Sequence, residues 1–187
     1  MIITEIIQSI TAIIIAGVAI YGLKEWKKQI RGKTNYEVAR RYLKASLELR
    51  DAMKYVRNPF IPASEMQSAL KEHGFSSDEY TDNLKTNRAV YSVRWKKVQE
   101  AWTSLEAESL EAEVCWGSDI ASISRPLINL TRELFAELQM YLDGNRKSLK
   151  DELIYNTGSD ENPDDFSKKV NQCIDKIREF LKPHLLD

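Results

Sequence analysis

The feature that most constrains this chain is an uncharged segment, residues 6–23, which is followed at once by a cluster of cations. As a helix rising about 1.5 Å per residue, these eighteen residues would span about 27 Å, close to the hydrocarbon thickness of a bilayer. The only ionisable side chain upstream is Glu5, whereas a signal peptide carries positive charge before its apolar region. The segment therefore predicts a single transmembrane helix that is not cleaved, with an interfacial or buried helix as the alternative.

The residues just after the apolar segment predict its orientation. They form a membrane flank of five cations and one tryptophan: Lys24, Trp26, Lys27, Lys28, Arg31 and Lys33. The positive-inside rule places such a flank in the cytoplasm, and tryptophan suits the bilayer interface. We therefore expect a single-pass protein of the cell inner (plasma) membrane, with its N-terminus outside, its C-terminus in the cytoplasm and membrane lipid as a partner.

One side of the apolar segment carries small side chains at helical spacing. These are Ser9, Ala12, Ala16 and Ala19, separated by 3, 4 and 3 positions. Small residues on one stripe let two helix backbones approach closely in lipid. The stripe predicts a possible helix–helix contact, either in a homo-oligomer or with another membrane protein.

The rest of the chain has the size of one ordinary domain. We divide it into an anchor with its basic flank, residues 1–33, and a cytoplasmic helical bundle, residues 34–187. Cys115 and Cys173 are far apart and predict buried thiols without a disulfide. His73 and His184 belong to no metal-binding spacing, so we expect no metal and no cofactor.

Charge is unevenly distributed along the chain. Between Lys24 and Arg57 there are eleven Lys or Arg against four Asp or Glu, a net of +7, although the whole chain is close to neutral. Nucleic-acid binding is a rival explanation for this basic stretch, but the sequence pI of about 6.2 argues against it. We expect no nucleic-acid partner.

Four segments of the cytoplasmic part show apolar positions that alternate in steps of three and four. This spacing is typical of helices packed nearly parallel to their neighbours, and no alternating strand pattern occurs, so we predict an all-α, antiparallel four-helix bundle-like domain. The predicted core positions are Ala39, Tyr42, Ser46, Leu49, Met53 and Val56; Leu84, Arg88, Tyr91, Trp95, Val98, Trp102, Leu105, Ser109, Ala112 and Trp116; Ile120, Ile123, Leu127, Leu130, Leu134, Glu137 and Tyr141; and Phe166, Val170, Cys173, Ile177 and Phe180.

Glycine, proline and capping residues predict where these helices end. The first bundle helix either continues the membrane helix or is offset from it at Gly32, and the Asn-Pro pair at 58–59 ends it. A short helix should start at Ser64 and end before Gly74, and Gly117 with Ser118 should separate the two long helices. The last helix should begin at Pro163 and end at Pro183.

Four stretches, WKKQIRGKTNYEVARR, YVRNPF, LEAEVCWG and FLKPHL, carry a resemblance. In them the chain resembles a group of uncharacterised small bacterial single-pass membrane proteins with a helical cytoplasmic domain. The resemblance implies the same topology and a bacterial origin, and it implies no catalytic or ligand-binding residue.

Three classes of function remain open. The first is a membrane-tethered helical interaction or regulatory module with a protein partner. The second is a subunit of a larger membrane assembly, recruited through its transmembrane helix. An enzyme or metal protein is the least favoured, because the chain lacks the Glu-x-x-His, H-E-x-x-H, G-x-S-x-G and phosphate-loop motifs. We infer no catalytic residue and no small-molecule substrate.

Overall fold

The computed structural model describes residues 2–75, 83–143, 151–159 and 161–185; side chains are described from Thr11 onward within these ranges, except at positions 12, 13, 83, 151 and 152. No strand occurs in these ranges, so the all-α prediction is confirmed there. The helices are α1 (Ile2–Val56), α2 (Ala63–Glu72), α3 (Asn83–Trp116), α4 (Asp119–Leu142), α5 (Asp151–Ile154) and α6 (Asp165–Leu185).

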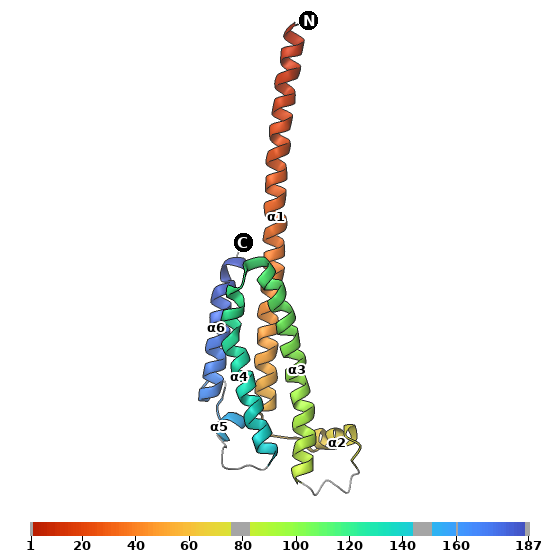
Figure 1. The fold of residues 1–187 in the computed structure, drawn as a ribbon, viewed down its shortest axis with the longest axis vertical. Helices are drawn as coiled ribbons and strands as arrows, with labels where there is room; N and C mark the ends of the chain where they lie inside the picture. The colour runs from red at the N-terminus through yellow and green to blue at the C-terminus, as the bar shows by residue number, and fades with distance from the viewer. Residues whose placement is uncertain (1, 76–82, 144–150, 160, 186–187) are drawn as a thin grey trace.

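The C-terminal half of α1 packs with α3, α4 and α6 into a bundle (Figure 1). Helix α1 lies against α3 and α6, and α4 lies against the same two helices on the far side. Neighbouring helices run in opposite directions, since each connection reverses the chain at one end of the bundle (Figure 1). This arrangement confirms the predicted antiparallel bundle.

Helix α1 runs without interruption through Gly32. The first bundle helix therefore continues the apolar segment, and is not offset from it. With 55 residues, α1 is about 80 Å long. Among its described side chains the first buried one is Val38, and the longer, N-terminal part of the helix projects beyond the bundle on its own (Figure 1).

The predicted core face of α1 is correct at every position. That of α3 fails before Tyr91, and after it Trp102, Ser109 and Trp116 are half-buried while the other predicted positions are buried. Leu84 and Arg88 are exposed. The start of α3 instead turns Ala89 and Val90 toward α2, with which they form a second, smaller core. The sequence pattern of α3 could not show this, because it does not reveal that a separate short helix covers a different face.

In α4 the buried face is shifted from the predicted one toward residues that include a serine and a threonine. The buried side chains are Ile120, Ser124, Leu127, Thr131, Leu134, Leu138 and Leu142. Thr131 is compatible with burial because its hydroxyl donates to the carbonyl of Leu127 at 3.0 Å, one turn earlier. The other predicted core positions of α4 are only half-buried: Ile123, Leu130, Glu137 and Tyr141.

In α6 four of the five predicted core residues are buried, and Phe180 is half-buried. Pro183 does not end this helix, which continues to Leu185. Its start is two residues later than predicted, since Asp164 caps it by accepting a hydrogen bond from the Ser167 N–H at 2.7 Å.

Two glycines end helices as predicted. Gly74 and Gly117 have φ of 74° and 83°, a left-handed conformation that glycine adopts without steric cost. Ser118 directly precedes α4 but makes no side-chain capping bond, and α2 begins at Ala63 after Pro62, not at Ser64.

Of the residues whose side chains are described, none before Val38 belongs to the main core. We therefore expect a protein of residues 34–187 to fold alone and to unfold in one cooperative transition, with the helical circular dichroism of a bundle. Urea unfolding monitored by circular dichroism checks this, and a broad transition or a strand-type spectrum would contradict it. The full chain in detergent is the control.

Candidate functional site

The N-terminal half of α1 exposes an unusual amount of apolar side chain. Six large residues between positions 14 and 23 are each 56–68% exposed: Ile14, Ile15, Val18, Ile20, Tyr21 and Leu23. They surround the helix, since they occupy nearly consecutive positions. The bundle does not cover this part of α1 (Figure 1). We call residues 14–23 the apolar segment of α1; they are the part of the uncharged stretch 6–23 in which every side chain is described.

The predicted membrane flank follows directly on the same helix. All six of its residues, Lys24, Trp26, Lys27, Lys28, Arg31 and Lys33, are exposed. Because α1 is continuous here, the cations and Trp26 lie on a straight rod between the apolar segment and the bundle (Figure 1). The helix thus changes from apolar to cationic within one turn.

The predicted small-residue stripe is described only in part. Ala16 and Ala19 are exposed, whereas the side chains of Ser9 and Ala12 lie outside the described residues. So do several side chains of the predicted span at 6–23. Within the part of the chain that is described, no helix is both long enough and apolar enough to cross a membrane.

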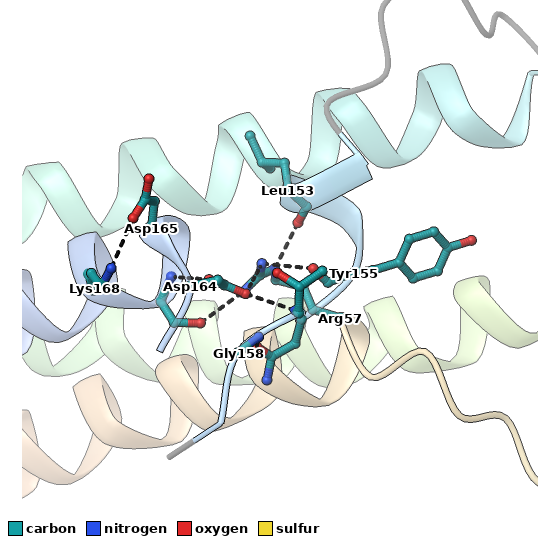
Figure 2. Close-up of polar contacts among 10 residues, drawn as sticks. Arg57, Leu153, Tyr155, Gly158, Asp164, Asp165 and Lys168 are labelled. Carbon is teal, nitrogen blue, oxygen red and sulfur yellow. Dashed lines mark hydrogen bonds and ion pairs between the residues drawn. The ribbon is translucent and has the colours of Figure 1, made fainter. Parts of the chain in front are cut away.

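At the end of the bundle that lies away from the apolar segment, Arg57 forms a buried polar site that the sequence did not suggest (Figure 2). Its Nε donates to the carbonyl of Leu153 at 2.7 Å, and its Nη1 donates to the hydroxyl of Ser167 at 2.9 Å. Nη2 donates to the carbonyl of Tyr155 at 3.1 Å and to the carboxylate of Asp164 at 2.8 Å. Arg57 thereby joins the end of α1 to the 153–164 connection and to α6.

The Arg57 site is almost closed to water. The side chains of Arg57 and Asp164 are 2% and 7% exposed, and the guanidinium lies 4.5 Å from the ring centre of Phe166. Burial raises the pKa of Asp164, but the hydrogen bonds from Arg57 and Ser167 outweigh it, so the pKa lies below its ordinary value. The carboxylate is therefore held in its charged form.

A cavity of about 340 Å³ adjoins this site between α1 and α6. Arg50, Lys54, Asn156 and Asn171 are among its polar lining residues, and Phe166 is among the apolar ones. Arg50 donates to Asp51 at 2.8 Å, and Arg57 is engaged as described above. The contacts of Arg57 join distant parts of the chain, so the site has a structural role at this end of the bundle.

A second buried arginine, Arg94, attaches the 58–62 linker and α2 to α3. Its Nε and Nη2 donate to the two carboxylate oxygens of Glu65 at 2.7 and 2.8 Å. It also donates to the carbonyls of Asn58 at 2.6 Å and Phe60 at 2.9 Å. The hydrogen bond from Arg94 lowers the pKa of Glu65, to which the Tyr55 hydroxyl also donates.

Sequence reasoning missed both arginines because their partners lie elsewhere in the chain. The one local signal is that Arg57 immediately precedes the Asn-Pro break at the end of α1. Of the two cysteines, Cys173 is buried as predicted and Cys115 is half-buried, and both are free thiols. The described residues contain no group of three His, Cys, Asp or Glu side chains placed to hold a metal ion.

Comparisons with protein families, curated proteins and solved structures found no match to this chain. The candidate functional feature is therefore defined by geometry alone. It is the rod formed by the apolar segment of α1 and its cationic flank.

Proposed function

We propose that this protein is a membrane-tethered helical interaction or regulatory module. The observation that carries the proposal is the apolar segment of α1, which is exposed around the helix and projects beyond the bundle. In water such a surface would favour aggregation, whereas in a bilayer it is fully compatible with its surroundings. We place residues 1–33 in and against the inner membrane and residues 34–187 in the cytoplasm.

The cationic flank supports the proposed orientation. Five exposed cations directly beside an anionic cytoplasmic leaflet would contribute about 1 kcal/mol each. Trp26, which is 58% exposed, lies at the level of the bilayer interface in this arrangement. Both features would hold the same end of the helix on the cytoplasmic side.

The continuity of α1 supports a role in positioning. From Leu23 to Val38 the helix spans fifteen residues, or about 22 Å, before the bundle begins. A continuous helix holds the bundle at a set distance from the membrane, whereas a flexible linker would let it approach the lipid. Confinement of this kind raises the effective concentration of the bundle near a membrane-bound partner.

The bundle exposes apolar side chains that a protein partner could cover. Leu110 and Val114 lie one turn apart on α3 and are 67% and 87% exposed, and Phe60 is 71% exposed. The proposal assigns no catalytic residue, cofactor, nucleic acid or small-molecule substrate. The second candidate, a subunit of a membrane assembly, is favoured by the exposed Ala16 and Ala19 on the apolar segment.

Vesicle flotation tests the tether. We expect the purified full chain, reconstituted from detergent, to float with vesicles of phosphatidylcholine and phosphatidylglycerol. It should also resist extraction by alkaline carbonate, because high pH releases proteins that are held on the surface by charge but does not release a helix that spans the bilayer. A protein of residues 34–187 should stay at the bottom of the gradient. Release of the full chain by carbonate would contradict a spanning helix and indicate surface attachment.

A charge variant tests the role of the flank separately. Replacing Lys24, Lys27, Lys28, Arg31 and Lys33 with glutamine should leave carbonate resistance intact while weakening the orientation bias, because the apolar segment is unchanged. The measurement is the digestion of the bundle by a protease that is added only to the outer side of the membrane. Unchanged, complete protection of the variant would show that the flank does not set orientation.

A further inference from the structure

A line of exposed side chains follows one side of α1 from the apolar segment into the flank. Its members recur in steps of 3, 4, 3 and 4 residues: Ala16, Ala19, Leu23, Trp26 and Ile30. This is the spacing by which paired helices contact each other along a shared axis. We call these five residues the α1 seam. Two of them, Ala16 and Ala19, also belong to the predicted small-residue stripe.

The α1 seam does not lie on the core face of α1. Ile30 precedes Tyr42, which lies near the middle of that face, by twelve positions, a rotation of about 120° around a helix. Leu23 precedes Tyr42 by nineteen positions, a rotation of about 100°. A second helix could therefore lie along the seam beside α1, to one side of the bundle.

Neither lipid nor the protein's own bundle covers the C-terminal end of the seam. If Leu23 marks the edge of the hydrocarbon, Ile30 lies about 10 Å farther along the straight helix, whereas the interfacial region is about 5–8 Å thick on each side. Ile30 is 46% exposed among exposed cations. An apolar residue in this position gains stability if a second helix covers it.

A second copy of this chain fits the seam better than an unrelated helix. Because every copy inserts with the same orientation, two α1 helices in one membrane are parallel and at the same depth. Identical seam residues then face each other. Lys24, Lys28 and Arg31 lie off the seam, and Lys33 takes the next seam position, three residues after Ile30, where the apolar line ends. We propose that the chain forms a parallel dimer through the α1 seam, an inference that rests on the proposed membrane insertion.

The exposed area indicates that this dimer depends on the membrane. Leu23, Trp26 and Ile30, which are 56%, 58% and 46% exposed, offer roughly 300 Å² per chain. A stable interface in water buries about 800 Å² per partner. Pairing therefore requires the part of α1 within the bilayer, where Ala16 and Ala19 let the two backbones approach closely.

Disulfide cross-linking in vesicles tests the dimer. Cys115 and Cys173 are first replaced by serine and alanine, and then Ile30→Cys is compared with Lys28→Cys, a position of nearly the same depth on the opposite side of α1. With purified protein in vesicles of phosphatidylcholine and phosphatidylglycerol, we expect severalfold more dimer from Ile30→Cys. Adding Ala16→Leu and Ala19→Leu should reduce that dimer, whereas Val18→Leu, off the seam, should not.

Equal dimer yields from Ile30→Cys and Lys28→Cys would overturn the proposal, because random collision has no preferred side. An undiminished yield with both alanines enlarged would overturn it too. Flotation of each variant separates the two levels of inference. An Ile30→Cys protein that floats without cross-linking refutes only the dimer, and a chain that does not float refutes the tether as well.

Discussion

Replacing Arg57 with methionine is expected to lower the free energy of unfolding by about 3–5 kcal/mol. The change preserves most of the side-chain volume but leaves the buried carboxylate of Asp164 without its cation. It also leaves the carbonyls of Leu153 and Tyr155 without a donor, and each unpaired buried group costs about 1–3 kcal/mol. Urea unfolding of the residue 34–187 protein measures the loss, provided that this protein folds alone as predicted.

A surface ion pair is the matched control for Arg57. Arg178 donates to Asp175 at 2.6 Å, slightly shorter than the 2.8 Å between Arg57 and Asp164, but both side chains of this pair are exposed. Arg178→Met should therefore cost less than about 1 kcal/mol. Similar costs for the two arginines would show that burial of Arg57 does not govern its contribution.

Variants of Asp164 separate its charge from its capping role. Asp164→Asn keeps an oxygen for the Ser167 N–H, whereas Asp164→Ala removes both the charge and the cap and should cost about 1 kcal/mol more. Because the folded pKa of Asp164 lies below the unfolded value of 3.8, its stabilisation is complete above that value and is lost as pH falls through the folded pKa. The difference in stability between wild type and Asp164→Asn should shrink accordingly in acid.

Replacing Arg94 with methionine is expected to release α2 from the bundle. Glu65 would lose both of its short hydrogen bonds to the guanidinium, and the linker carbonyls of Asn58 and Phe60 would lose their donor. Undocking of α2 returns these groups to water, and α2 has only a small core with α3 to oppose it. A loss of about 3–5 kcal/mol should accelerate amide exchange in Ala63–Glu72 about 10²–10⁴-fold.

Hydrogen exchange resolved by peptide distinguishes local from global loss in the Arg94 variant. Amides of α4 and α6 should keep most of their protection, because the hydrogen bonds of Arg94 go to the 58–62 linker and α2. Arg94→Lys should also accelerate exchange in α2, since an ammonium cannot reproduce the two-pronged contact with Glu65. Uniform acceleration across all helices would show that Arg94 stabilises the whole bundle and does not serve α2 in particular.

The sequence by itself determined those features that depend on neighbours along the chain. The core face of α1 and most of that of α6 follow from helical periodicity, because residues three and four apart share a side of any helix. Gly74 and Gly117 mark helix ends for an equally local reason, which is the left-handed backbone they adopt. The exposed apolar segment and its cations likewise follow from composition over a few turns.

Only the tertiary structure decided which helix faces meet and which polar groups are buried. The start of α3 turns toward α2, and Ser124 and Thr131 replace apolar residues in the core of α4, because the neighbouring helices select the covered side. Arg57 contacts residues 96–110 positions away, and Arg94 contacts residues 29–36 positions away. A charged side chain can be buried only where several such partners converge, and that convergence exists only once the helices have packed.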